Sequence, residues 1–240
     1  MVPCKPTITH RERDRMMNDQ DEMIKIFDSA DDDGLRSLNA DLYAIHMLRW
    51  MNPKRNSSVM ELACGNGRVA QSITCIRNDL DYACMDICPT LTKKAQQLNP
   101  RMKIYTGDCL KKIPYKAYGK YDQIISWGFV QYLSPDQFLN LNHMLLTHLD
   151  EDGEIWHFSI PDNTRRWIHN MGLRNTILSK LKGVLKYLVD SPKRYYAEAC
   201  IWHDPEELQR AHEDSMIMQI IQPGDIDYRF HIGIKNRSQK

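Results

Sequence analysis

A short glycine-rich segment, Gly65-Asn66-Gly67, carries the clearest chemical signal in the sequence. It follows an apolar run at residues 58–63, which we expect to be a buried strand, and it precedes a helical pattern that begins at Arg68. A strand, a glycine turn and a helix start bring backbone amides close to a ligand, and glycine lets that ligand approach without a Cβ in the way. The segment therefore predicts a ligand-binding turn.

Three acidic side chains lie at or near the ends of the first three expected strands: Glu61, Asp86 and Asp108. The carboxyl ends of parallel strands share one edge of a sheet, so the three belong to one constellation. Asp86 is placed to accept both hydroxyls of a ribose, and Asp108 could accept from an exocyclic amine. The pattern indicates a nucleoside site at that edge.

The elements that must position these residues follow from alternating apolar runs and turn signals, which are typical of a mostly parallel α/β sheet. Ser134, followed by proline and then by glutamine at the third position, predicts the start of a helix that runs through Leu149. Two terminal apolar runs are joined by only four residues, and such a short connection permits only an antiparallel pair. The expected strands are 58–63, 81–86, 102–105, 121–126, 154–160, 216–221 and 226–234, with helices at 38–51, 68–76, 89–98 and 176–189.

Together these elements predict a Rossmann-like, seven-stranded mixed sheet with an antiparallel terminal hairpin and helices on both faces. We expect one domain over residues 1–240. Its core comprises 56–160 and 204–240, with an N-terminal helical cover over 1–55 and a helical insertion over 161–203 that covers the substrate. Both covers are expected over one edge of the sheet.

Composition excludes several classes of protein. Hydrophobic residues at 42% and charged residues at 26% rule out collagen-like, low-complexity and wholly disordered chains. A formal net charge of +1 argues against strong steering toward nucleic acid. The start lacks a secretory signal, and no apolar stretch reaches the roughly 18 residues that a membrane-spanning helix needs. Seven cysteines without a C-x-x-C pair favour reduced thiols over disulfides or zinc, so we expect a cytoplasmic protein without a metal site.

The segment at residues 59–70 resembles the first motif of the class I S-adenosylmethionine-dependent methyltransferases, in which the first strand ends in acidic-x-Gly-x-Gly-x-Gly. Glu61 matches the acidic position, and Ala63 replaces the first glycine, a small change that leaves backbone contact available. Residues 121–133 resemble the family's fourth-strand motif. The resemblance covers about 55–160 and 204–236.

This resemblance implies S-adenosylmethionine as the cofactor. It implies that Asp86 holds the ribose, that Asp108 with Cys109 borders the adenine, and that Glu61 with the backbone of 63–67 holds the methionine end. The cofactor-binding residues that it implies are Glu61, Ala63, Gly65, Asn66, Gly67, Asp86, Ile87, Asp108, Cys109, Ser126, Trp127 and Gly128.

Two other functions fit parts of the sequence. Gly65-x-Gly67-x-x-Ala70, with an acidic residue about 20 positions on, satisfies the fingerprint of NAD(P)-dependent oxidoreductases. Glu61 inside the strand and the antiparallel hairpin favour a methyltransferase instead. A non-catalytic, methyltransferase-like binding subunit is the other alternative, but it would not need the intact turn and the carboxylates.

Candidate catalytic residues are His203, Asp162 and His157. A histidine within a strand, such as His157, is more often a satisfied core residue, and Asp162 fits a turn at least as well as a catalytic role. His203 and its neighbour Trp202 would face the cleft if the insertion folds back. Candidate substrate-binding residues are Gln131, Tyr132, Arg165, Arg166 and Trp202.

The insertion is basic, with Asp190 as its single acid between residues 163 and 196. This pattern fits a solvated helix face, an anionic acceptor gripped by arginine, or peripheral contact with an acidic membrane. We expect O-methylation of a small, polar, anionic acceptor, such as a phosphorylated or nucleotide-linked sugar or a polysaccharide precursor. The segments at 201–205 and 227–231 are similar to bacterial methyltransferases that modify polysaccharides. We expect no nucleic-acid partner, and a homodimer is compatible with the sequence.

Overall fold

The computed structural model describes residues 24, 40–114, 120–165, 201–212, 216–221 and 229–236. Its strands are β1 (Ser58–Leu62), β2 (Asp81–Asp86), β3 (Lys103–Thr106), β4 (Tyr121–Trp127), β5 (Leu149–Pro161), β6 (Met216–Ile221) and β7 (Arg229–Asn236). Its helices are α3 (Ala40–Met51), α4 (Arg68–Ile76), α5 (Pro89–Leu98), α6 (Pro135–Leu146) and α9 (Pro205–His212), with 3₁₀ turns η2 (Val130–Tyr132) and η3 (Asn163–Arg165).

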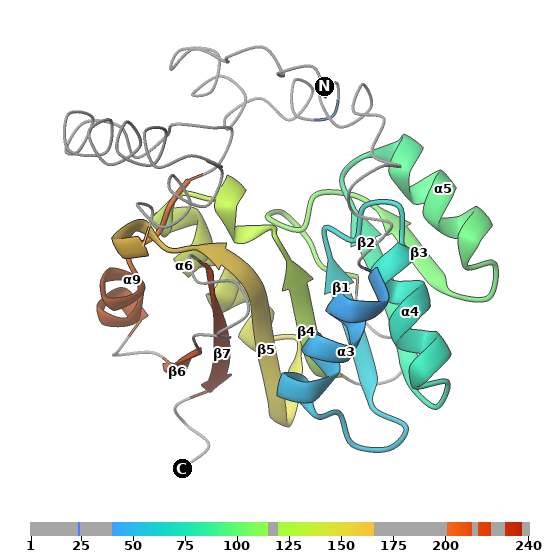
Figure 1. Cartoon of the computed structure of the whole chain (residues 1–240), viewed down its shortest axis with the longest axis horizontal. Coiled ribbons are helices and arrows are strands. Elements are labelled where there is room, and N and C mark those ends of the chain that lie inside the picture. The colour runs from blue at the N-terminus through green and yellow to red at the C-terminus, as the bar shows by residue number, and fades with distance from the viewer. Residues whose placement is uncertain are drawn as a thin grey trace, which may run out of the picture.

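The seven strands form one sheet in the order β3-β2-β1-β4-β5-β7-β6 (Figure 1). The first five strands are parallel, whereas β7 is antiparallel to both β5 and β6. This arrangement confirms the predicted mixed sheet with an antiparallel terminal hairpin. The parallel order also brings the carboxyl ends of β1, β2, β3 and β4 to one edge, where the predicted site lies.

Helices cover both faces of the sheet, as predicted. On one face, buried residues of α3 and α4 pack with β1, β2, β4 and β5 into one apolar cluster that includes Met47, Ile73 and Phe158. In Figure 1, α3 lies in front of the sheet, and it packs against α4, so this part of the N-terminal cover lies on a face and not along an edge. On the opposite face, α6 and α9 contribute Phe138 and Leu208 to a second cluster.

The helix start predicted at Ser134 is confirmed, because its hydroxyl accepts from the Gln137 amide and the Gln137 side chain accepts from the Ser134 amide. The helix ends at Leu146, earlier than predicted. Strand β5 then begins at Leu149 rather than at residue 154, because Leu149 pairs with Tyr121 of β4 before the ladder becomes irregular. The turn expected at residues 152–153 is therefore an irregularity within one long strand.

Part of the prediction falls beyond the described ranges. The helix expected at 176–189 and residues 226–228 of the last expected strand both lie outside them. No helix within those ranges has the length and apolarity that would span a membrane.

Candidate active site

The glycine turn between β1 and α4 is held by a carboxylate from the neighbouring strand. The Gly65 amide donates to Oδ2 of Asp86 at 2.8 Å, and the Cys88 amide donates to Oδ1 of the same side chain at 2.9 Å. Asp86 is the last residue of β2, so its two oxygens fix the β1–α4 turn against the β2–α5 turn. The short distances indicate charge-assisted bonds that order the turn before any ligand binds.

A cavity opens where this turn meets the ends of β2, β3 and β4, and we call it the aspartate cavity. Asp86, Ile87, Asp108, Cys109, Trp127 and Tyr132 are among its lining residues. The Asp108 carboxylate accepts from the Leu110 amide at 2.9 Å, and burial raises the pKa of the Cys109 thiol, which therefore stays protonated. The predicted ribose and adenine residues thus share one cavity.

A second cavity lies on the other side of the turn, and we call it the arginine cavity. Its lining includes Tyr43, Glu61, Asn66, Arg68, Gln131 and Arg229. The two cavities share four residues: Ala63, Gly65, Trp127 and Gly128. Because they meet at the glycine turn, an elongated ligand can lie across both.

Among the described residues, Glu61 is the one carboxylate that lines the arginine cavity. Its side chain is 2% exposed, and Oε2 accepts from the Tyr82 hydroxyl at 2.8 Å. Burial raises the pKa of Glu61 to about 7, and the nearby Asp86 adds to the rise, while the bond from Tyr82 opposes it. Within the described part of the chain, Oε1 receives no hydrogen bond, so a cationic group in the cavity would find an acceptor there.

Arg229, at the start of β7, also lines the arginine cavity. Its guanidinium donates to the Ser159 carbonyl at 2.6 Å and to Oε1 of Gln131 at 3.3 Å. Ser159 has a φ of 63° at the irregularity between β5 and β7, a left-handed conformation that costs about 1 kcal/mol or more for a residue with a Cβ. Arg229 thus holds a strained backbone segment against the cavity.

The three candidate catalytic residues do not line either cavity. Both ring nitrogens of His157 are bonded within the core, Nδ1 to Ser126 at 2.8 Å and Nε2 to Asn142 at 2.9 Å. Asp162 accepts from the amide and hydroxyl of Thr164, which is a turn role. These contacts are of the kind that the alternative, structural interpretation of each residue expects.

His203 is also buried, at 2% exposure, and its Nε2 donates to the Val130 carbonyl at 3.1 Å. Burial lowers the pKa of this imidazole to about 4, and the bond to the carbonyl only partly offsets that shift. Its neighbour Trp202 is 6% exposed and does not line the two cavities. Both side chains are therefore buried, and neither faces the aspartate cavity or the arginine cavity.

The remaining predicted site residues lie in different parts of the structure. Gln131 and Tyr132 line the arginine and aspartate cavities, respectively. Ser126 is fully buried beside His157, and Arg165 is paired with Asp162 at 3.6 Å rather than directed to a cavity. Arg166 and the basic part of the insertion lie outside the described residues.

Arg229 and Tyr43 are two of the lining residues that the sequence analysis did not predict. Arg229 could have been found, since a hairpin strand antiparallel to β5 must begin at the edge where β5 ends. Tyr43 stacks on Trp127 with ring centroids 4.5 Å apart, and no sequence signal joins these two positions. The missed contacts are those made between distant elements.

Comparison with known proteins identifies a methyltransferase domain within the chain. Residues 59–153 match the family model described as a methyltransferase domain. Curated protein sequences gave no significant match.

Solved structures share the fold at low sequence identity. The chain is similar to the pyocyanin biosynthetic protein PhzM (TM-score 0.60, 16% identity, 88% of this chain and 61% of that one). It is similar to the plantazolicin methyltransferase BpumL in complex with SAH (TM-score 0.59, 17% identity, 95% of each chain). It is also similar to the mitomycin 7-O-methyltransferase MmcR (TM-score 0.61, 12% identity, 93% of this chain and 60% of that one). The chain thus spans about three fifths of the length of PhzM and MmcR.

The domain match covers the glycine turn and the ends of β1, β2, β3 and β4, and the fold as a whole is shared with methyltransferases of known structure. These findings favour the methyltransferase prediction over the oxidoreductase. Residues 59–153 carry a methyltransferase domain, and the fold is that of the class I S-adenosylmethionine-dependent methyltransferases.

Proposed function

We propose that this chain transfers a methyl group from S-adenosylmethionine to an anionic oxygen of a small, polar acceptor, of the kind found in phosphorylated or nucleotide-linked sugars. The observation that carries the proposal is the arginine cavity, which Arg229 and Arg68 line next to the shared turn. The name of MmcR, an O-methyltransferase, supports oxygen as the target atom. The names of MmcR and BpumL support a small acceptor.

The residues of the two cavities fit the cofactor. A Cβ built on Gly65 meets no atom within 4 Å, so the space beside the turn is open to a ligand. We propose that Asp86 accepts the ribose hydroxyls, that Asp108 and Cys109 border the adenine, and that Glu61 accepts the methionine ammonium group. The bound cofactor supplies an electrophilic methyl on a sulfonium, so the protein's task is mainly to position the acceptor and exclude water.

The class of acceptor is inferred from the charged residues that line the arginine cavity and from the histidines that could act as a base. Arg68 and Arg229 line the arginine cavity against one carboxylate, Glu61, which we assign to the cofactor. Among the described residues, neither His157 nor His203 is placed or tuned to take a proton from an alcohol. An oxygen that is already ionised needs no such base, and guanidinium groups bind it well.

Cofactor affinity is expected to rise with pH because Glu61 must ionise to bind an ammonium group. A carboxyl with a pKa of about 7 is about 9% ionised at pH 6 and about 76% ionised at pH 7.5, which corresponds to roughly eightfold tighter binding at the higher pH. Calorimetry with S-adenosylhomocysteine at both pH values, in buffers of different ionisation heat, measures the affinity and the released proton.

The control for this prediction is Glu61→Gln, which should bind weakly and with no pH dependence over the same range. If the wild-type affinity were equally independent of pH, the proposed role of Glu61 would be contradicted.

The raised pKa of Glu61 also affects the stability of the folded chain. The folded chain keeps this proton up to about pH 7, whereas an unfolded glutamic acid releases it near 4.5, so stability decreases as pH rises between these values.

The acceptor class is tested with paired compounds and labelled cofactor. Sugar phosphates and nucleotide sugars are each compared with the uncharged parent sugar. We expect kcat/KM for the anionic member of each pair to be roughly tenfold higher or more, since a guanidinium–oxyanion contact is lost in the other. Equal turnover of the neutral sugars would rule out the proposed acceptor class.

Variants of Arg229 assign that preference to the arginine cavity. Arg229→Gln should raise the acceptor KM roughly tenfold and leave the cofactor Kd nearly unchanged, while Arg229→Lys should restore part of the loss. Arg210→Gln, an exposed arginine on α9, serves as the matched control. A change in cofactor affinity that equals the change in acceptor KM would mean that Arg229 is only structural.

A further inference from the structure

The side chain of Gln131 is fixed at one end by Arg229. Its Oε1 accepts from Nη1 and from Nη2 of the guanidinium, at 3.3 Å each. This pairing determines which way the amide points, because a guanidinium has only donors and must therefore face the amide oxygen. The amide nitrogen, Nε2, thus lies on the side of the amide that faces away from Arg229.

The Gln131 nitrogen lies close to the place where the aspartate and arginine cavities meet. A Cβ built on Gly128 would lie 3.8 Å from Nε2, and Gly128 lines both cavities. Nε2 makes no hydrogen bond with the described residues, and it is not one of the fully buried polar atoms that lack a partner. Since Gln131 itself lines the arginine cavity, its two N–H groups are accessible donors there.

A second donor, the hydroxyl of Ser159, lines the same cavity and is held by the same arginine. The carbonyl and hydroxyl oxygens of Ser159 both accept from Nη1 of Arg229, at 2.6 and 3.2 Å. Its amide donates to Nδ1 of His231 at 3.1 Å, so this left-handed residue, with a φ of 63°, is fixed from both sides. Strained backbone of this kind occurs mainly at functional sites. Because Oγ accepts from the guanidinium, its hydrogen can turn to a ligand.

Arg229 also makes these two side chains stronger donors. A donor that bonds to an amide or hydroxyl oxygen polarises the group, which strengthens the group's own N–H or O–H as a donor. The guanidinium bonds to an oxygen of both Gln131 and Ser159. Two polarised donors next to a positive charge suit a carboxylate or a phosphate, whose several oxygens can each accept a hydrogen bond.

The connectivity of the cofactor brings its methyl group close to these donors. In S-adenosylmethionine the sulfonium joins the ribose to the methionine chain. With the ribose at Asp86 and the methionine ammonium at Glu61, the sulfur lies where the two cavities meet, which is the place that Gly128 lines. Nε2 of Gln131 is close to the same glycine, so an anion that it holds lies next to the methyl group.

We infer that Gln131 and Ser159 are the donor pair that holds the carboxylate or phosphate group of the acceptor beside the methyl group. Arg229 adds its charge and fixes the orientation of both donors. This inference rests on the proposed function and deepens it. One oxygen of the acceptor uses a lone pair to form the bond to the methyl carbon, while the C–S bond breaks toward sulfur. The products are a methyl ester and S-adenosylhomocysteine, and no proton is transferred.

The test measures binding of glucose 6-phosphate, glucuronate and glucose to the protein saturated with S-adenosylhomocysteine. In calorimetry, we expect an anionic sugar to bind at least roughly tenfold more tightly than glucose, because glucose lacks the charged group. The tighter of the two anions identifies phosphate or carboxylate as the anchored group. In ¹⁵N–¹H spectra, the side-chain amide of Gln131, assigned from its own backbone amide, should shift with the bound anion and not with glucose.

The variant Gln131→Glu separates the donor role of Gln131 from its contact with Arg229. It keeps an oxygen for the guanidinium and replaces the amide nitrogen with a second oxygen. We expect it to fold and to bind S-adenosylhomocysteine with nearly wild-type affinity, but to bind the anion roughly a hundredfold more weakly. Ser159→Ala should weaken the anion roughly fivefold through loss of one donor. Gln97→Glu, the same change at an exposed position on α5 that lines neither cavity, should bind as the wild type does.

The possible failures are distinguishable. Anion binding that Gln131→Glu leaves unchanged would overturn the inference and leave methyl transfer standing, and so would a complex with S-adenosylhomocysteine that binds neither anion. If Gln131→Glu weakened S-adenosylhomocysteine as much as the anion, Gln131 would hold the carboxylate of the cofactor instead. Should that variant fail to fold, an unshifted Gln131 side-chain amide in the wild type would overturn the inference. A wild-type protein that does not bind S-adenosylhomocysteine would overturn the proposed function itself.

Discussion

Asp86→Ala is expected to weaken binding of S-adenosylmethionine by about 3 kcal/mol, roughly a hundredfold in Kd. The carboxylate makes two kinds of contact that alanine cannot make. It holds the turn through Gly65 and Cys88, and it is the acceptor that we assign to the ribose hydroxyls. Calorimetric titration of the wild type and the variant with the cofactor and its demethylated product measures the loss.

The matched control is Asp81→Ala at the opposite end of the same strand, where the side chain is exposed and remote from both cofactor cavities. The cofactor affinity of Asp81→Ala should equal that of the wild type. The affinity of Asp86→Asn should lie between those of Asp86→Ala and the wild type, since the remaining amide oxygen can accept from one of the two backbone amides. A wild-type affinity in Asp86→Ala would contradict the ribose assignment.

Gly67→Ala is expected to be the most destabilising substitution in the turn. Gly67 caps α4 with a φ of 75°, and a Cβ there would lie 2.8 Å from the Cβ of Ala95 on α5. Left-handed strain and overpacking against that helix together cost about 3 kcal/mol, or roughly 6–12 °C in Tm for a chain of this size. Thermal unfolding followed by circular dichroism measures the shift.

Gly65→Ala provides the contrast within the same turn. Its φ of 57° carries similar strain, but its Cβ would enter open space in the two cofactor cavities. The variant should therefore lose less stability than Gly67→Ala, and it should lose cofactor affinity by roughly tenfold or more because the methyl occupies the ligand's space. If the two variants lost stability equally, close packing against α5 would not be the reason for glycine at Gly67.

The sequence allowed the parallel core to be predicted almost residue by residue. Strands β1 and β2 are buried on both faces, so each appears as a short apolar run bounded by turn residues. The hairpin of β6 and β7 followed from the length of its connection. The boundary between α6 and β5 was wrong, because the start of β5 depends on pairing between Leu149 and Tyr121, a contact between distant residues.

The cofactor side of the site was more predictable than the acceptor side. Its residues lie at strand ends, where topology alone brings Asp86 and Asp108 together. The roles of the two candidate histidines, His157 and His203, could not be predicted in the same way, because they depend on burial. Nothing in the sequence around His203 reveals that its imidazole packs inside the protein and donates to a carbonyl.

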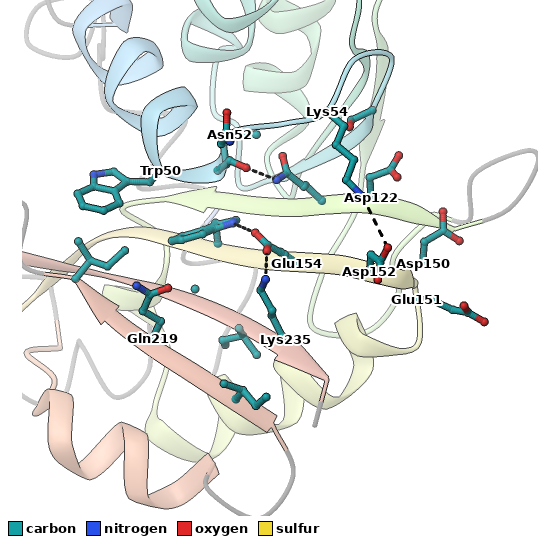
Figure 2. A pocket seen from close by; sticks show the side chains of 18 residues that line it. Trp50, Asn52, Lys54, Asp122, Asp150, Glu151, Asp152, Glu154, Gln219 and Lys235 are labelled. Atoms are coloured by element: carbon teal, nitrogen blue, oxygen red, sulfur yellow. Dashed lines mark hydrogen bonds and ion pairs between the residues drawn. The ribbon is translucent and has the colours of Figure 1, made fainter. Parts of the chain in front are cut away.

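Helix α3 lies beside two separate regions of the domain. Tyr43 stacks on Trp127 beside the cofactor cavities, and Trp50, about 10 Å further along the axis, lines another cavity, of about 800 Å³ (Figure 2). The helix runs without a break between these two residues. By thermodynamic linkage, any factor by which a ligand bound beside Trp50 changes the affinity for S-adenosylmethionine must equal the factor in the reverse direction.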